Sequence, residues 1–84
     1  MARWPEWWEW ELEITPHLER RMLDRRFDEL ELRAMLQRAT GCHAVEETGR
    51  FAIVTMRTRR AWRIIVEPDA AEQVLVVITA YEVG

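Results

Sequence analysis

The sequence contains no lysine, a single cysteine and only 3 glycines and 3 prolines. The one cysteine, Cys42, excludes an internal disulfide, and with only His17 and His43 beside it the chain has no spacing typical of a metal site. No signal peptide is recognisable, and the longest apolar run, Val74 to Ile78, is too short to cross a membrane. We therefore expect a cytoplasmic protein with no metal, no other cofactor and no membrane partner.

The charge balance limits the kind of partner that the surface can bind. All 12 basic residues are arginine, but 15 acidic residues leave a net charge of −3. Nucleic-acid-binding proteins usually carry a strong positive balance, so any RNA contact here would come from a local arginine cluster on an acidic body. Arginine suits bidentate recognition of carboxylate or phosphate, although a genome rich in G and C explains the same bias.

The length and the composition indicate one globular domain. The chain has 84 residues, of which 49% are apolar and 32% charged, a composition too apolar for a disordered protein. A chain of this size buries only roughly 60% of the surface that its unfolded form exposes. We expect a single domain over residues 1–84, in which residues 1–7 form a Trp-rich N-terminal extension.

The first half of the chain predicts a strand and then a helix. From Trp8 to Ile14, aromatic and aliphatic residues alternate with glutamates, and a period of two is typical of a half-buried strand. Thr15 and Pro16 then supply an N-cap and a first helical residue. We expect this helix to run to about Arg26, with a core side formed by Leu18, Met22 and Leu23.

A second helix is expected to begin at Asp28, because Asp28 and Glu31, three residues later, resemble a capping box. Its apolar residues recur at i, i+3, i+4 and i+7, the pattern of one buried helix face: Leu32, Met35, Leu36 and Ala39. Gly41 stands where a helix C-terminus favours a left-handed residue. The two short helices are expected to form a hairpin or an angled pair.

The second half of the chain predicts an antiparallel meander. Its candidate strands are His43–Glu47, Phe51–Thr58, Ala61–Glu67 and Val74–Val83. Turn signals at Thr48-Gly49, Arg59-Arg60 and Pro68–Ala71 separate them. The last strand is apolar on both faces, which favours a central place in the sheet. The expected fold is α+β: strand, helix and helix, followed by a three- to four-stranded antiparallel meander.

The first candidate site is a row on the first expected helix, where His17, Arg21 and Arg25 are spaced four residues apart. The positive end of a helix favours the neutral imidazole that a general base needs. Two neighbouring guanidinium groups can hold a phosphate and stabilise developing negative charge, as cleavage of RNA by its own 2′-hydroxyl requires. The same spacing also fits a solvated helix face whose arginines pair with acidic residues: Glu13, Glu19, Asp24 or Glu29.

A second candidate site is a cluster of arginines around one aromatic residue: Arg57, Arg59, Arg60, Trp62 and Arg63. Such a cluster suits nucleic-acid binding, because guanidinium groups contact the backbone and the ring stacks on a base. Arginines at a hairpin tip also keep strand edges soluble, so a structural role stays open.

Thr79 and Tyr81 share one face of the last expected strand. A tyrosine near the end of a sheet can donate a hydrogen bond to a phosphate or orient a base. It can equally pack as an amphipathic side chain, so both interpretations stay open.

The start of the chain has more tryptophans than so small a core easily absorbs: Trp4, Trp7, Trp8 and Trp10. Large aromatic side chains are enriched at protein interfaces. The cluster therefore predicts a surface for a homodimer or for a partner protein.

The chain also resembles a known family. The run from His17 to Arg25 matches the pattern H-x-x-x-R-M-x-x-R, which marks the first helix of an uncharacterised bacterial family of small proteins. The segments Trp62–Asp69 and Val76–Tyr81 are similar to the closing strands of that family, and the resemblance extends from Trp8 to Val83. The family is grouped with the BrnT and RelE-like toxins, whose fold is a small twisted sheet with helices on one face.

The resemblance implies a toxin-like, metal-independent ribonuclease that a cognate antitoxin neutralises. Carried over by position, it assigns catalytic roles to His17, Arg21 and Arg25, and further to Thr79 and Tyr81. The alternative function is a non-catalytic interaction module on the same fold, which binds a partner protein or a second copy of itself through the Trp-rich strand.

Overall fold

The computed structural model describes residues 4–83, so part of the expected Trp-rich extension, residues 1–3, lies outside the described residues. The elements along the chain are the 3-10 helix η1 (Glu6–Glu9), β1 (Glu11–Ile14), α1 (Pro16–Arg25), α2 (Glu29–Gln37), β2 (Gly41–Ala44), β3 (Phe51–Arg57), β4 (Arg60–Asp69) and β5 (Val74–Glu82). This order confirms a strand, two helices and then a run of strands.

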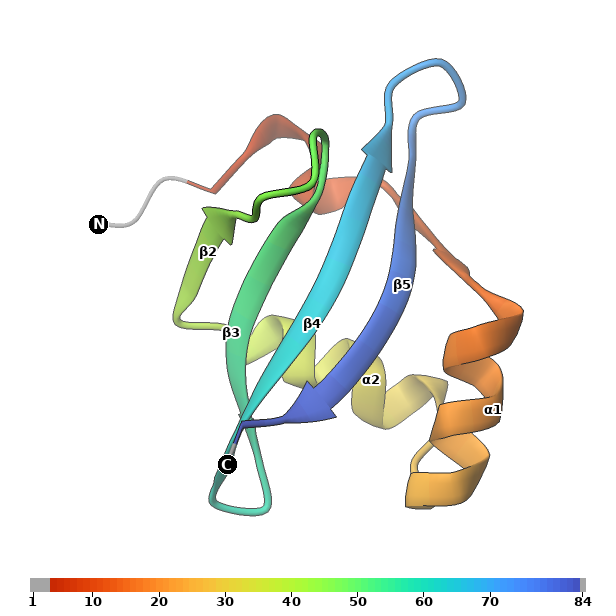
Figure 1. Ribbon diagram of the computed structural model, residues 1–84, viewed down its shortest axis with the longest axis vertical. Helices are drawn as coiled ribbons and strands as arrows, with labels where there is room; N and C mark the ends of the chain where they lie inside the picture. Colours follow the sequence, from red (N-terminus) through yellow and green to blue (C-terminus); the bar gives the residue numbers. More distant parts are fainter. Residues whose placement is uncertain (1–3, 84) are drawn as a thin grey trace.

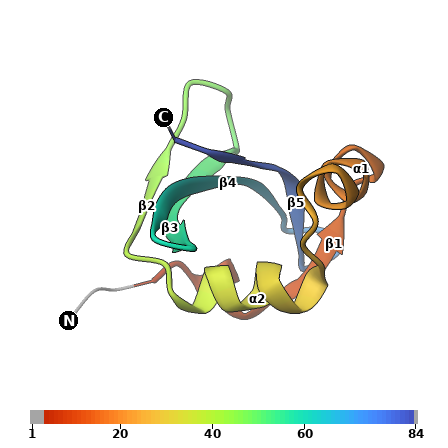
Figure 2. The same cartoon turned by 90° about the horizontal axis from the view of Figure 1, so that it is seen from below.

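The strands form one mixed sheet in the order β1-β5-β4-β3-β2 (Figure 1). β2 to β5 form an antiparallel meander, whereas β1 pairs in parallel with β5. Figure 2 shows a strongly curled sheet, with α2 across its concave side and α1 beside β5. The α+β class is confirmed, and β5, which is apolar on both faces, lies between β1 and β4.

The core fills the space between the sheet and the helices. The largest fully buried apolar side chains come from both helices and from β3, β4 and β5: Leu18, Leu32, Met35, Ile53, Ile64, Val66, Leu75 and Val77. The hydroxyl group of Thr55 is also buried there, and it donates a hydrogen bond to the carbonyl oxygen of Met35. This bond joins β3 to α2 and satisfies a polar group that would otherwise destabilise the core.

The expected strand from Trp8 to Ile14 is wrong in its first part, because β1 begins only at Glu11. The backbone N–H of Trp8 donates to the carbonyl oxygen of Pro5 at 3.0 Å, and this bond belongs to the turn of η1. Proline presets a φ angle that suits the start of such a turn. The alternation of exposed glutamates with half-buried apolar residues nevertheless extends over the whole segment from Trp8 to Ile14, although only its second part is a strand.

Helix α1 begins as predicted, since the side chain of Thr15 accepts a hydrogen bond from the backbone N–H of Leu18. It ends at Arg25, and Arg26 caps it in the left-handed conformation at φ 59°. The prediction that Leu23 belongs to the core is wrong, because this side chain is 79% exposed. Leu23 lies about 140° around the helix from Leu18, too far from the centre of the buried stripe.

Helix α2 begins at its predicted cap, where the side chain of Asp28 accepts a hydrogen bond from the backbone N–H of Glu31. The carboxylate of Glu31 does not complete a capping box and instead pairs with Arg38 and Arg57. Gly41 does not cap this helix either. The helix ends at Gln37, and Gly41 is the first residue of β2.

Two of the predicted turns differ in outcome. Gly49 adopts a φ of 83°, which supports the predicted turn at Thr48-Gly49. The predicted link Pro68–Ala71 lies too early, because Pro68 and Asp69 still pair with β5 as part of β4. The connection to β5 therefore begins at Ala70.

Candidate functional site

His17, Arg21 and Arg25, which we call the α1 row, line one shallow depression together with Arg20 and Asp24. His17 and Arg25 are exposed, and Arg21 is half-buried. Because residues four apart lie on the same side of a helix, the row follows directly from the regular geometry of α1. The structure therefore brings the three residues of the first candidate site to one surface.

Neither arginine of the α1 row forms an ion pair with a carboxylate within residues 4–83; ion pairs in that range involve other arginines. Glu29, one of the acids considered as a partner, is bonded to Arg33 at 2.9 Å. The Nε atom of Arg21 is buried without a hydrogen-bond partner among these residues. This buried Nε atom is not accessible to an anion from solvent, so the row offers the other guanidinium nitrogens of Arg21 and those of the exposed Arg25.

Thr79 and Tyr81 do not line this depression. They pair across the sheet with Ile65 and Arg63, respectively, and are half-buried. Side chains alternate along a strand, so Thr79 and Tyr81 point to the face of β5 opposite the buried Ala80. They therefore lie on the outer face of the sheet.

Among the described residues, none from α2 lines the depression of the α1 row, and α2 lies across the concave side of the sheet, opposite this outer face (Figure 2). Leu23 and Arg26, on the other flank of α1, line a depression with Asp28 and Glu31 at the start of α2. α1 packs beside β5 (Figure 2). The five residues carried over from the family resemblance are consequently divided between two neighbouring elements, α1 and β5, and do not line one depression.

Two residues of the second candidate site, Trp62 and Arg57, pack against Phe27 inside the protein. Trp62 is only 2% exposed and contacts Phe27 edge to face, with ring centroids 5.6 Å apart, so its ring offers no surface for a base. The guanidinium group of Arg57 lies 4.9 Å from the ring centroid of Phe27 and pairs with Glu31 at 3.6 Å. The prediction that Trp62 stacks on nucleic acid is therefore wrong.

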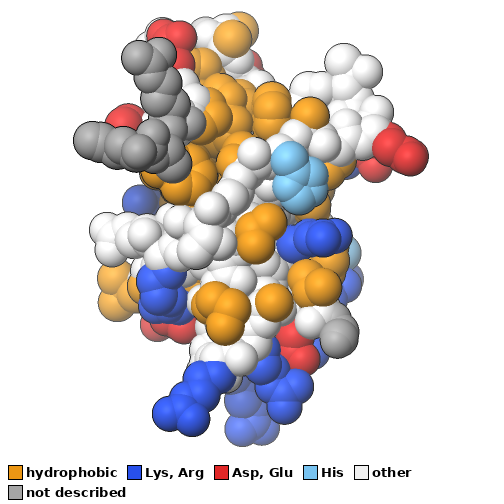
Figure 3. All heavy atoms as spheres, turned by 90° about the vertical axis from the view of Figure 1, so that its left-hand side faces the viewer, with side chains coloured by type: hydrophobic (Ala, Val, Ile, Leu, Met, Phe, Trp, Pro, Cys, Tyr) orange, Lys and Arg blue, Asp and Glu red, His pale blue; other side chains and the backbone are white. Residues whose placement is uncertain are grey.

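The other arginines of that cluster differ in their surroundings. Arg60 pairs with Glu82 at 2.9 Å, whereas Arg59 and Arg63 form no ion pair within the described residues. Arg59 is exposed in the turn between β3 and β4, and Arg63 is half-buried in β4. Figure 3 shows arginine side chains gathered at the end of the molecule where this turn lies.

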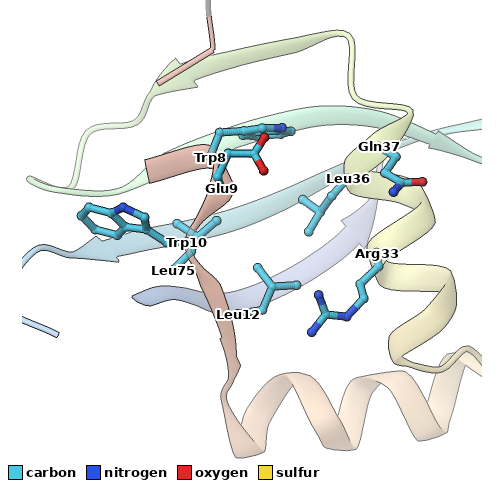
Figure 4. Close-up of a pocket in the computed structure, with 8 residues that line it drawn as sticks. All are labelled: Trp8, Glu9, Trp10, Leu12, Arg33, Leu36, Gln37 and Leu75. Carbon is cyan, nitrogen blue, oxygen red and sulfur yellow. The ribbon is translucent and has the colours of Figure 1, made fainter. Parts of the chain in front are cut away.

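An aromatic groove lies between the start of the chain and α2 (Figure 4). It is lined by residues from η1, β1, α2 and β5 and from the link before β1: Trp8, Glu9, Trp10, Leu12, Arg33, Leu36, Gln37 and Leu75. The unusual number of tryptophans near the start of the sequence indicated one wall of this groove. Nothing in the sequence indicated that α2 lines the groove as well, because this depends on how the helix packs.

The tryptophans are only partly exposed. Trp7, Trp8 and Trp10 pack against the core, and Trp4 stacks on Trp8 with ring centroids 4.4 Å apart. Trp7 contacts Phe51 at a centroid distance of 5.1 Å. Part of the aromatic surface is therefore buried against the core, and another part lines the groove.

The single cysteine and its neighbouring histidine differ in their surroundings. Cys42 points toward the core and its partial burial raises the pKa of the thiol, whereas the neighbouring His43 is exposed. Among residues 4–83, no group of histidine, cysteine and acidic side chains could hold a metal ion. None of the helices described here combines the length and the apolar character that crossing a membrane requires.

No protein-family model, curated protein or solved structure matches the chain.

Proposed function

We propose that this protein is a toxin-like ribonuclease that cleaves RNA without a metal ion. The observation that carries the proposal is the α1 row: an exposed imidazole and two guanidinium groups share one depression, and none of the three is paired with a carboxylate within residues 4–83. An imidazole beside two anion-binding groups has the composition that acid–base cleavage of a phosphodiester needs.

In this mechanism, the imidazole of His17 removes the proton from a ribose 2′-hydroxyl. The 2′-oxygen attacks the adjacent phosphorus, the bond from phosphorus to the 5′-oxygen breaks, and the leaving oxygen takes a proton from solvent. The products are a 2′,3′-cyclic phosphate and a free 5′-hydroxyl. Arg21 and Arg25 stabilise the negative charge on the phosphorane oxygens.

Thr79 and Tyr81 have a supporting role in the proposal. Their hydroxyl groups, on the outer face of β5, donate hydrogen bonds to an RNA strand that extends beyond α1. Arg59 and Arg63 remain available for contacts with the RNA backbone, whereas Arg57 and Arg60 are engaged by Glu31 and Glu82. Like other toxins of this kind, the protein would be neutralised by a cognate antitoxin.

The test combines growth and cleavage. Expression of the wild-type protein should slow bacterial growth, and the purified protein should cleave RNA in the presence of a chelator. His17→Ala and Arg21→Ala should each lower the cleavage rate by about 10²- to 10⁴-fold. His43→Ala and Arg33→Gln, which change residues outside the row, should retain the wild-type rate. Normal growth and intact RNA with wild-type protein would contradict the proposal.

A second function, protein binding through the Trp-rich start of the chain, is favoured by the aromatic groove. The two functions are compatible, because the groove and the α1 row share no lining residue. Trp8→Ala or Trp10→Ala should change the oligomeric state or abolish capture of a partner. A wild-type protein that is monomeric by native mass spectrometry and captures no partner would exclude this second function.

A further inference from the structure

The aromatic groove has an apolar floor and aromatic walls. Leu75 is 1% exposed at its base, with the partly buried Leu12 and Leu36 beside it. Trp8 and Trp10 line the side formed by the start of the chain (Figure 4). A groove of this composition accepts aliphatic side chains, as in the recognition of an amphipathic helix by a hydrophobic groove.

The rim of the groove is negatively charged overall. Arg33 lines it, but Nε and Nη2 of this guanidinium group both lie 2.9 Å from Oε2 of Glu29, so its positive charge is matched within α2. Glu9 forms neither an ion pair nor a side-chain hydrogen bond within residues 4–83. The remaining polar group of the rim is the neutral amide of Gln37.

Two indole rings beside an available carboxylate favour a cation. Trp4 covers one face of the Trp8 ring, so the carboxylate of Glu9 supplies the main attraction for an ammonium or guanidinium group, and a tryptophan face that stays open adds to it. Exposed acidic residues close to Glu9 in the sequence reinforce this preference: Glu6, Glu11 and Glu13. The same charges repel a phosphate backbone, so the groove is unsuited to the RNA that the α1 row is proposed to bind.

We propose that the aromatic groove binds a basic, amphipathic segment of a partner protein. Aliphatic side chains of that segment contact Leu12, Leu36 and Leu75, and an arginine or lysine lies between Glu9 and the tryptophan rings. The net charge of −3 supports a basic partner, because charge complementarity accelerates and orients association. The inference rests on the second proposed function and specifies the chemistry of the partner.

The test uses two designed probes and a matched pair of variants. The probes are fluorescently labelled 12-residue amphipathic peptides of leucine and alanine, with either arginine or glutamate on the polar face. Binding is measured by fluorescence anisotropy at low salt. Glu9→Lys reverses the charge that lines the groove, whereas Glu6→Lys makes the same change on an exposed residue of η1 that does not line it.

The basic peptide should bind to the wild-type protein, and the acidic peptide should not. Glu9→Lys should weaken binding of the basic peptide by about tenfold, and Glu6→Lys should change it by no more than about twofold. Raising the salt concentration should reduce this difference. Circular dichroism melting curves of both variants should match the wild type, which shows that the fold is retained.

Four results would overturn the inference. If Glu6→Lys and Glu9→Lys weaken binding equally, the attraction is a property of the whole acidic segment and not of the groove. If both peptides bind alike and Trp8→Ala weakens both, the groove binds proteins without preferring a cation, and the second function survives alone. If neither peptide binds but native mass spectrometry shows a dimer that Trp8→Ala dissociates, the occupant is a second copy. Failure to bind peptides together with a monomeric mass would exclude the second function as well.

Discussion

The side-chain hydroxyl of Thr15 ties the start of α1 to the body of β5. It accepts a hydrogen bond from the backbone N–H of Leu18 at 3.1 Å and donates one to the carbonyl oxygen of Ile78 at 2.9 Å. The backbone N–H of Thr15 also donates to the carbonyl oxygen of Val77 at 3.3 Å. Because His17 lies in the first turn after this residue, the position of the α1 row relative to the sheet depends on these bonds.

Thr15→Val should therefore impair both stability and cleavage. The change removes the helix cap and leaves the carbonyl of Ile78 without this donor, so the free energy of unfolding should fall by about 1–2 kcal/mol. Thr15→Ser keeps the hydroxyl and should remain close to wild type. Urea denaturation measures the difference. Equal midpoints for the valine and serine variants would contradict the role of the hydroxyl group.

The two leucines of α1 should respond very differently to truncation. Leu18 is fully buried, so Leu18→Ala should lower the free energy of unfolding by about 2–5 kcal/mol through the cavity it leaves. Leu23 is 79% exposed, so Leu23→Ala should change it by no more than about 0.5 kcal/mol. Thermal melting of both variants tests this order. A large loss for Leu23→Ala would show that α1 is rotated relative to the structure.

Arg57 should matter for stability, whereas Arg59 should not. The guanidinium group of Arg57 lies over the rings of Phe27 and Trp62, at 4.9 and 5.5 Å from their centroids. Arg57→Gln should lower the free energy of unfolding by about 1–2 kcal/mol, since a shielded cation–π contact is lost. Arg59→Gln, in the exposed turn, should stay within about 0.5 kcal/mol of wild type. Chemical denaturation distinguishes the two, and equal effects would contradict the structural assignment of Arg57.

The thiol of Cys42 should make the fold less stable in alkali. Burial raises the pKa of this thiol in the folded chain, so the folded state binds the proton more tightly than the unfolded state does. The stability from this group is fully present below the pKa of the unfolded chain and is lost as the pH rises through the higher folded value. The stability advantage of wild type over Cys42→Ala should therefore shrink as the pH is raised from neutral to above the ordinary thiol pKa of about 8.5. A constant difference across that range would contradict the burial effect.

Local signals in the sequence were sufficient for the helices and most of the strands. The caps Thr15 and Asp28 act through hydrogen bonds to residues three positions along the chain, so they can be read without tertiary structure. The α1 row is also local, because helix periodicity alone places its members together. The buried face of β4 had a signal too, since Trp62 alternates in step with Ile64 and Val66, which are both buried.

The features that the sequence did not predict depend on contacts between distant segments. Whether Leu23 or Leu18 is at the centre of the buried stripe is decided by how α1 lies against β5. The Trp-rich segment forms η1 and packs near α2. This packing brings together residues that are far apart in the chain, such as Trp8 and Leu36 in the aromatic groove. The parallel pairing of β1 with β5 likewise had no local signal.

The most direct test of the central claim is the cleavage of two RNA oligonucleotides of identical sequence, one with ordinary ribose and one fully 2′-O-methylated, by the purified protein in a chelator. If His17 activates a 2′-hydroxyl, only the ordinary RNA should be cut, and mass spectrometry should show a 2′,3′-cyclic phosphate on the upstream product. His17→Ala should leave both oligonucleotides intact. Cleavage of the methylated RNA, full activity of His17→Ala, or no cleavage of either oligonucleotide would contradict the claim.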